Sequence, residues 1–364
     1  MTVKVLEKND INALLAIFDD LQFNLYDLAP DKSSLTVDEA IFSYIEYFSI
    51  RNNSGPIDSL QIRDGSLKIK SLGPLALLRG LKYLDLSSIT WISELAPLAN
   101  LTNLNYLELN DGIIVRDLSP LSRLTNLGLL TLTQFRLIKD LSPLDNLVNL
   151  FHLTLTGATT LVDLRPLAVL TELTLLDLSG CPRIRDLRPL GSLARLKNLN
   201  LTGCSAVENL SVLAGLTRLS YLNLGDCPLI EDISALANLT DLTSLVFLGD
   251  RAVTDFEPLS KLFKLSNLVL SGAKGLNTLE PLASLTNLSY LDLSGCVGLE
   301  DLSPLANLSR LTHLSLSGCV KIRDLRTLAN FKSLNYLDLT GLGAVSGLEE
   351  LTERSNLKIA GLKA

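Results

Sequence analysis

Residue types that carry most enzyme chemistry are scarce in this sequence of 364 residues. It contains two histidines, one tryptophan and one methionine, and aromatic residues form 5% of the chain. The five cysteines are too few, and odd in number, for a disulfide-linked scaffold. Lysine and arginine total 32 against 39 acidic residues, so the net charge is −7. That sign argues against a general role in binding nucleic acid or an anionic membrane.

Long apolar segments are also missing. No run of about 18 apolar residues occurs, so we predict no transmembrane helix. Residues 1–15 lack the basic leader, apolar stretch and small-residue cleavage site of a secretory signal. We therefore expect a cytoplasmic protein, and delivery to a host by a route without a cleaved leader stays open. The chain exceeds the length at which one core stops growing, about 250–300 residues, which predicts two domains or one elongated domain.

A 23-residue repeat dominates the sequence. The motif Leu-x-x-Leu-x-Leu begins at Leu81 and returns every 23 residues as far as Leu334, and Leu357 falls on the same grid. An imperfect copy begins at Ile57, one residue out of register. Self-similarity at a period of this length predicts a solenoid, in which each unit buries its apolar side chains against its neighbours.

Each unit, numbered 1 to 23 from its first leucine, predicts a strand, a turn and a short helix. Residues 173–195 show the consensus, with apolar residues at positions 1, 4, 6, 12, 15, 18 and 21. Positions 4 to 6 alternate with period two, which favours a strand. Glycine, frequent at position 8, suits a turn with positive φ. Ser-Pro at positions 16 and 17, as in Ser119-Pro120, predicts a helix N-cap followed by proline at the first helical position.

These motifs resemble those of the leucine-rich repeat family over residues 57–357. Asp-Leu-Ser-Pro-Leu-Ala-Asn-Leu-Ser-Arg-Leu at residues 301–311 resembles bacterial internalin-like repeats, and the turn from Cys181 to Ile184 resembles the cysteine-containing subtype. The resemblance implies an α/β fold: a solenoid in the form of a curved horseshoe, with a parallel concave sheet and short helical or 3-10 turns on the convex side. It also implies recognition of a macromolecular partner on the concave face.

The repeat grid predicts three parts of the chain. Residues 1–56 lie off the grid and are expected to form a helical N-terminal cap, with one helix after Asn9-Asp10 and a second that carries Phe48 on its inner face. Residues 57–342 form the solenoid, and residues 343–364 a C-terminal cap. Whether the N-terminal helices only cover the first coil or also dock a partner stays open.

Two polar columns run through the repeats, with cysteine at position 9 of five units and aspartate at position 14 of eight. We expect the cysteines to be buried free thiols, because stacked neighbours about 5 Å apart that point the same way have poor disulfide geometry. Metal or redox chemistry is the alternative. We expect the aspartates to accept backbone N–H groups of the turn, with ion binding as the alternative. The cysteines are Cys181, Cys204, Cys227, Cys296 and Cys319, and the aspartates are Asp117, Asp140, Asp163, Asp186, Asp232, Asp255, Asp301 and Asp324.

No catalytic constellation is predicted. His152 and His313 both occupy position 3, seven units apart, and strand spacing of about 4.8 Å then separates them by roughly 30 Å. They cannot share a metal or act as a catalytic pair. The sequence contains no phosphate-binding loop, nucleophile elbow or metal-spaced histidine set. We therefore expect no catalytic residue, no metal and no cofactor.

Arginines cluster on loop positions of neighbouring units. A solvated rim is the simplest interpretation, and an anion or acidic-partner site that uses bidentate guanidinium contacts is the alternative. No aromatic residues are interleaved with them, so nucleic acid is not expected. The rim comprises Arg165, Arg183, Arg185, Arg188 and Arg195, of which the first four are the candidate anion ligands.

Tyrosines gather on the predicted concave face. Five of the eight occupy position 3, and four of these precede an acid by two residues, so that both side chains point to the same side of the strand. Exposed tyrosine offers contact area at a low entropy cost, whereas the alternative is tyrosine chosen only for its β-propensity. The predicted partner-binding residues are Tyr83, Asp85, Tyr106, Glu108, Leu129, Phe151, His152, Leu175, Tyr221, Tyr290, Asp292, His313, Tyr336 and Asp338.

The sequence thus predicts a non-enzymatic protein–protein interaction module that binds a protein or peptide on its concave face. Two lysines and five acids are expected on that face, which predicts a partner with a neutral to basic surface. The alternatives are an anion or small-ligand sensor that uses the Arg165–Arg195 rim, and the targeting arm of an enzyme complex. Nucleic acid and membranes are not expected as partners.

Overall fold

The computed structural model describes residues 48–51, 58–62, 72–89, 92–112, 114–248 and 253–361. It divides into two compact units, Met1–Leu176 and Asp177–Ala364, which are described one at a time. Most of the predicted N-terminal cap lies outside the described residues. The exception is strand β1, Phe48–Arg51, so Phe48 is not part of the predicted second helix.

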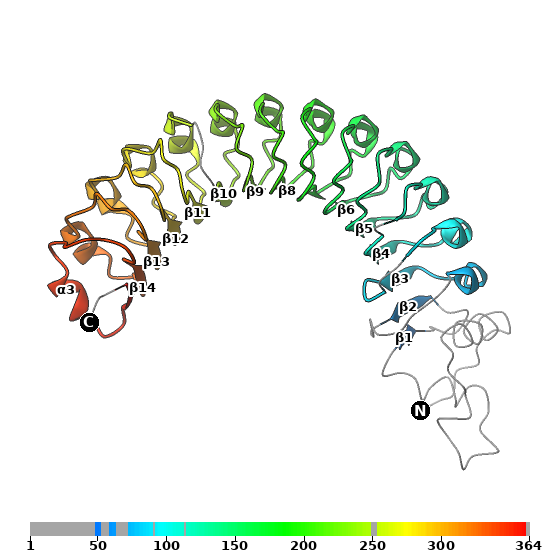
Figure 1. Cartoon of the computed structure of the whole chain (residues 1–364), viewed down its shortest axis with the longest axis horizontal. Helices are drawn as coiled ribbons and strands as arrows, with labels where there is room; N and C mark the ends of the chain where they lie inside the picture. The colour runs from blue at the N-terminus through cyan, green and yellow to red at the C-terminus, as the bar shows by residue number, and fades with distance from the viewer. Residues whose placement is uncertain are drawn as a thin grey trace, which may run out of the picture. The chain divides into compact units, whose positions relative to one another are not determined.

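The first unit repeats a strand and a 3-10 helix (Figure 1). Its first two strands pair antiparallel, and each later strand pairs in parallel with the one before it. The strands are β1 Phe48–Arg51, β2 Ser59–Ile62, β3 Tyr83–Leu86, β4 Tyr106–Asn110, β5 Leu129–Thr133 and β6 His152–Thr154. The 3-10 helices are η2 Gly73–Leu77, η3 Ala96–Asn100, η4 Ser119–Leu121, η5 Ser142–Leu144 and η6 Arg165–Val169. Strand β7, Leu175–Asp177, contains the point at which the two units divide.

The second unit continues the same pattern, with every strand from β8 to β15 parallel to its neighbour. The strands are β8 Asn198–Asn200, β9 Tyr221–Asn223, β10 Ser244–Val246, β11 Asn267–Val269, β12 Tyr290–Asp292, β13 His313–Ser315, β14 Tyr336–Asp338 and β15 Lys358–Ala360. The 3-10 helices are η7 Arg188–Ser192, η8 Ser211–Gly215, η9 Ser234–Asn238, η10 Glu257–Lys261, η11 Glu280–Leu282, η12 Ser303–Asn307 and η13 Arg326–Asn330, and a short helix α3 spans Glu349–Thr352.

The fold class is confirmed as a leucine-rich repeat solenoid. Within each unit the strands line the inner side of the curve and the 3-10 helices lie on the outer side (Figure 1). The strand pairing joins equal positions of successive repeats, as in Tyr83 with Tyr106 and Leu314 with Leu337. Strand β15 extends the parallel pairing into the segment predicted as a C-terminal cap, but one residue out of the 23-residue register, with Tyr336 paired to Lys358.

Leucines form the core between successive coils. In the repeat that begins at Leu196, the apolar residues at all seven consensus positions are at most 2% exposed. Burying one such side chain stabilises the fold by about 1.5–3 kcal/mol before chain entropy is subtracted. These residues are Leu196, Leu199, Leu201, Val207, Leu210, Leu213 and Leu216.

The turn after each strand follows the glycine prediction. Gly157 and Gly318 have φ values of 75° and 71°, the left-handed region that glycine enters without a Cβ clash. Asp111, Gln134 and Asp226 take the same conformation without being glycine, with φ values of 53°, 61° and 51°. The turn conformation is therefore a property of the repeat, and the residue that occupies it varies.

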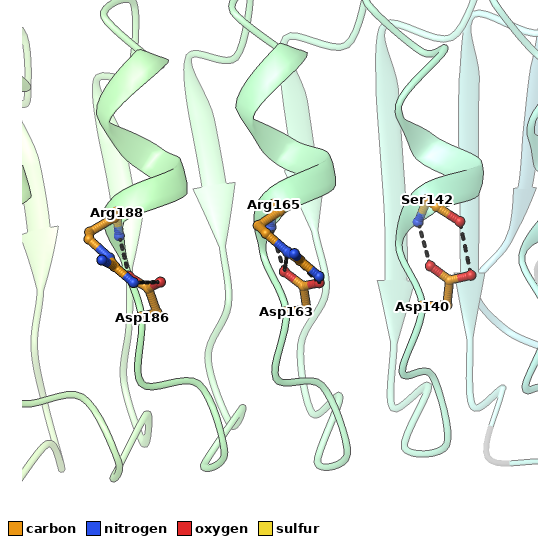
Figure 2. A network of polar contacts seen from close by, with 6 residues as sticks. All are labelled: Asp140, Ser142, Asp163, Arg165, Asp186 and Arg188. Carbon is orange, nitrogen blue, oxygen red and sulfur yellow. Dashed lines mark hydrogen bonds and ion pairs between the residues drawn. The ribbon is translucent and has the colours of Figure 1, made fainter.

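The aspartates at position 14 start the 3-10 helices, as the structural interpretation predicts. In all eight units their Oδ1 accepts the backbone N–H of the residue at position 16, at 2.7–2.9 Å. Figure 2 shows this bond at Asp140, Asp163 and Asp186. The prediction that serine at position 16 is the N-cap is wrong. Ser119 and Ser142 are the first helical residues. Their backbone N–H groups donate to the carboxylate of the aspartate two residues earlier, which is the capping residue.

Candidate functional site

The candidate site is the inner face of the strands, formed by positions 3 and 5 of each repeat. Alternation along a strand places these two side chains on one side and the buried residues at positions 4 and 6 on the other. Strand β14 shows the pattern, with Leu337 buried between the partly exposed Tyr336 and Asp338. All the predicted partner-binding residues except Phe151 lie at these two positions.

In the first unit, Tyr83 and Tyr106 stack on neighbouring strands. Their ring centroids are 4.1 Å apart and their planes differ by 18°. The Tyr106 hydroxyl donates to Glu108, and burial together with this hydrogen bond raises the pKa of Tyr106 well above its usual range. We call Tyr83, Asp85, Tyr106 and Glu108 the N-terminal cluster.

Asp85 of the N-terminal cluster is only 4% exposed, which is unusual for a carboxylate on a strand surface. It accepts Gln61 Nε2 at 2.6 Å and the Ser87 backbone N–H at 2.9 Å. Gln61 was missed in the sequence, although it stands at position 5 of the imperfect copy that begins at Ile57. The N-terminal cluster therefore satisfies most of its polar atoms internally.

Four more of the predicted partner-binding residues, Leu129, Phe151, His152 and Leu175, lie in the first unit and are partly brought together. Leu129 lies beside His152 in the parallel register, and His152 Nε2 lies 3.1 Å from Thr154 Oγ1. The backbone N–H of Leu175 donates to the carbonyl of Phe151. Phe151 stands at position 2, is 50% exposed, and packs against Gly128, where a Cβ would lie 2.5 Å from its ring. It therefore borders the inner face instead of lying within it.

In the second unit, three rings form a column across β12, β13 and β14. Tyr290 and His313 have centroids 5.9 Å apart with planes at 28°, and His313 and Tyr336 repeat this at 5.9 Å and 29°. Tyr290 is 39% exposed, and burial, followed by the charge of Asp292, raises its pKa. Tyr221 lies on β9 and is not part of the column; its hydroxyl accepts Asn223 Nδ2 at 3.2 Å.

Two carboxylates flank a serine beside this column. Asp292, Ser315 and Asp338 occupy position 5 on successive strands, paired in register. Asp292 Oδ1 accepts the Ser294 N–H at 2.8 Å, and Asp338 Oδ1 accepts the Thr340 N–H at 2.9 Å. We call Tyr290, His313, Tyr336, Asp292, Ser315 and Asp338 the C-terminal patch.

The cysteines are buried free thiols, as the structural interpretation predicts. All five are 0% exposed. The thiols of Cys204, Cys227, Cys296 and Cys319 each donate to a backbone carbonyl of the preceding repeat, at 3.1–3.3 Å. Burial raises the pKa of Cys296 to about 12 and that of Cys319 to about 11, so these thiols remain protonated at neutral pH.

The arginines of the candidate anion site divide into two kinds. Arg165 and Arg188 each form an ion pair with the capping aspartate of their own repeat, Asp163 and Asp186 (Figure 2). Hydrogen bonds from the Arg188 side chain and backbone lower the pKa of Asp186 to about 2. Arg183 and Arg185 are exposed and have no recorded ion pair. The sequence analysis did not predict this pairing. The arginines stand at position 16, where other repeats have serine, two residues after the aspartate of the same repeat.

Two shallow hollows lie beside the capping residues of the second unit. One, of about 240 Å³, is lined by Arg185, Asp186, Arg188 and Asn209 among others. The other, of about 280 Å³, includes Glu208, Asn209, Leu229 and Asp232. Both mix charges of opposite sign or carry acids, so neither concentrates positive charge for an anion.

Within the described residues, no three side chains from histidine, cysteine, aspartate and glutamate gather as a metal-binding group. The same part of the chain contains no helix with the length and apolar character to cross a membrane.

Several solved structures similar to this chain are bacterial internalins or leucine-rich repeat proteins. An internalin, InlF, of Listeria monocytogenes str. 4b F2365 has a TM-score of 0.72 and 26% identity, over 98% of each chain. A leucine-rich repeat protein of Leptospira interrogans has a TM-score of 0.56 and 19% identity, over 83% of this chain and 88% of that one.

The functional domain of InlJ from Listeria monocytogenes, which includes a cysteine ladder, has a TM-score of 0.52 and 21% identity, over 79% of this chain and 64% of that one. No protein-family model and no curated protein matches the chain. The chain therefore has a leucine-rich repeat fold with internalin-like repeats, and its buried cysteines stack in successive repeats.

Proposed function

We propose that the chain is a non-enzymatic interaction module that binds a protein or peptide on the inner face of its strands. Similarity to internalins supports a protein-interaction role in general terms. The specific support is the C-terminal patch, where three stacked rings stand on a sheet surface that contributes nothing to the core. Exposed aromatic side chains of this kind dominate the energy of many protein interfaces.

The fourteen residues predicted from the sequence, thirteen on the inner face and Phe151 at its border, remain the proposed contact set, with different weights. The C-terminal patch is the principal anchor, because Tyr290 and His313 are exposed, Tyr336 is partly exposed, and Asp292 and Asp338 each keep an open acceptor oxygen. The N-terminal cluster, with Leu129, His152 and Phe151 beside it, is a second contact region. Tyr221 contributes singly.

Charge on the inner face favours a neutral to basic partner surface. Position 5 carries Asp85 and Glu108 in the first unit and three acids in the second, whereas Lys82 and Lys197 stand at position 2, on the border of the face. Complementary charge of this kind steers encounter and sets specificity more than it adds affinity. Nucleic acid, which is an anion, does not fit this face.

The anion-sensor alternative is less well supported. Arg165 and Arg188 are already neutralised by Asp163 and Asp186, which leaves Arg183 and Arg185 as its ligands. An enzyme-targeting arm would use the same inner face, so the experiment below applies to it as well.

The test is partner capture with the Tyr290→Ala, Tyr336→Ala double variant. We expect loss of capture with an unchanged unfolding midpoint, because both rings lie outside the core. A matched control is Val297→Ala with Val320→Ala, which removes two exposed apolar side chains at position 10, 40% and 48% exposed, away from the strands. Capture that survives in the tyrosine variant, or that fails equally in the valine control, would refute the proposal.

A further inference from the structure

Several hydrogen-bond donors in and around the C-terminal patch are already used within the protein, which leaves acceptor atoms open to a ligand. The Thr312 hydroxyl donates its single proton to the Ser289 carbonyl at 2.8 Å, and it also lies 3.0 Å from His313 Nδ1. A carbonyl can only accept, so Nδ1 must carry the hydrogen that joins it to Thr312. In the neutral ring this leaves His313 Nε2 as an acceptor.

The hydroxyl protons of the serines beside the carboxylates are likewise used in hydrogen bonds within the protein. Ser294 Oγ donates to Asp292 Oδ1, so its 2.8 Å contact with Ser315 Oγ requires Ser315 to be the donor. Neither hydroxyl then has a proton to offer a ligand. Asp292 Oδ2 and Asp338 Oδ2 have no recorded partner among the described residues, so two carboxylate oxygens remain open.

The arrangement places these acceptors beside an aromatic surface. Asp292 and Asp338 are two strands apart, about 10 Å by strand spacing, with only the small Ser315 between them. The rings of Tyr290, His313 and Tyr336 stand in the adjacent row. Lys358, the next residue of that row, lies on β15 beyond Tyr336 and forms no recorded ion pair within the described chain.

Resting on the proposed function above, we infer that the C-terminal patch receives an arginine side chain of the partner between Asp292 and Asp338. Arginine carries five N–H donors in a planar fork, stays charged at any physiological pH, and stacks on aromatic rings. It therefore supplies donors to the open carboxylate oxygens of Asp292 and Asp338, a positive charge against these two carboxylates, and a flat face for the rings. Citrulline has nearly the same shape without the charge and provides the matched probe.

The experiment follows the histidine ring signals of the full chain by NMR during titration with the peptide Gly-Gly-Arg-Gly-Gly. The chain has only two histidines, and His152, in the first unit, is an internal control. His313→Gln identifies the His313 signals. We expect the arginine peptide to move the His313 signals and leave those of His152 in place.

Variants then test the carboxylates. We expect Asp292→Asn with Asp338→Asn to weaken the arginine peptide at least about tenfold, because charge-assisted hydrogen bonds are lost. Asp177→Asn removes one carboxylate on β7, several strands from the patch, and should leave the affinity unchanged. Equal affinity for the citrulline peptide, an unchanged affinity in the double variant, or no movement of the His313 signals would each overturn the inference.

Partner capture separates this inference from the proposed function. One outcome is that capture is lost in the Tyr290/Tyr336 double variant and complete in the Asp292/Asp338 double variant. That outcome would contradict the arginine site and support the inner-face module. Capture that survives the tyrosine substitutions would sink the module itself. Loss of capture in both double variants, but not in Asp177→Asn, supports the arginine site.

Discussion

The N-terminal cluster and the C-terminal patch use the same repeat positions and differ in what they leave open. In the first, Tyr106 donates to Glu108, and Gln61 and Ser87 donate to Asp85, so the polar atoms are largely satisfied within the cluster. In the second, Ser315 stands where the first has Glu108, and Asp292 and Asp338 each keep a carboxylate oxygen without a recorded partner. The residues at position 5, more than the tyrosines themselves, therefore determine whether the polar atoms beside the stacked rings are hydrogen-bonded within the protein or stay open.

The spacing of the rings supports the same distinction. The tyrosine pair of the first unit is in close contact at 4.1 Å, whereas the second column holds its rings 5.9 Å apart. The wider spacing leaves more of each ring face accessible, and Tyr290 is 39% exposed. Three sets of substitutions sharpen this comparison.

The largest expected effect concerns what the two regions share. Leu107→Ala and Leu314→Ala each remove a fully buried leucine from a strand that carries one of the clusters, β4 or β13. We expect each to lower the free energy of unfolding by about 2–5 kcal/mol, measured by urea denaturation, because a cavity remains between coils. Similar losses would show that the regions share one scaffold; a loss below about 1 kcal/mol at either site would contradict the repeat packing.

A smaller effect is expected in the turns that follow the strands. Asp111 follows the N-terminal cluster with φ at 53°, whereas Gly318 follows the C-terminal patch at 71°. We expect Gly318→Ala to destabilise by about 1 kcal/mol and Asp111→Gly to stabilise by about 0.5 kcal/mol, since left-handed strain is partly offset by unfolded-chain entropy. Thermal unfolding of both variants measures this. The same sign for both substitutions would show that the φ value is not the cause.

The smallest effect distinguishes the tyrosine hydroxyls. Tyr106→Phe should lower the free energy of unfolding by about 0.5–1 kcal/mol at neutral pH, because the hydrogen bond to Glu108 is lost at a partly solvated site. Tyr290→Phe, whose hydroxyl has no recorded hydrogen bond, should change it less.

The pH dependence of the two variants provides a second readout. The folded state raises the pKa of Tyr106, so its contribution is complete below the unfolded value, about 10, and is lost as the pH rises above that value. Urea denaturation at successive pH values should show a smaller alkaline loss in Tyr106→Phe than in the unsubstituted chain. An identical alkaline loss in both would contradict the role of Glu108 in holding the Tyr106 proton.

Periodicity was sufficient to predict the strands, the buried leucines, the cysteine column and the aspartates that bond the turn. These features repeat because each coil meets the same neighbour, so residue type and position carry the information. The identity of the helix cap was missed, since the sequence motif Ser-Pro hides the fact that aspartate two residues earlier makes the bond. The pairing of Arg165 with Asp163, and of Gln61 with Asp85, depends on side-chain conformation and on an irregular first copy, which period counting does not contain.

The aspartate that begins each 3-10 helix also determines how freely the outer rim can change. Its carboxylate accepts the main-chain N–H of position 16, the first helical residue, and every residue except proline has this N–H. The bond therefore does not depend on which side chain stands at position 16. Ser119, Arg165 and Glu257 all occupy this place over an unchanged backbone. The rim can therefore become neutral, positive or negative by single substitutions, while the inner face of the strands stays unchanged.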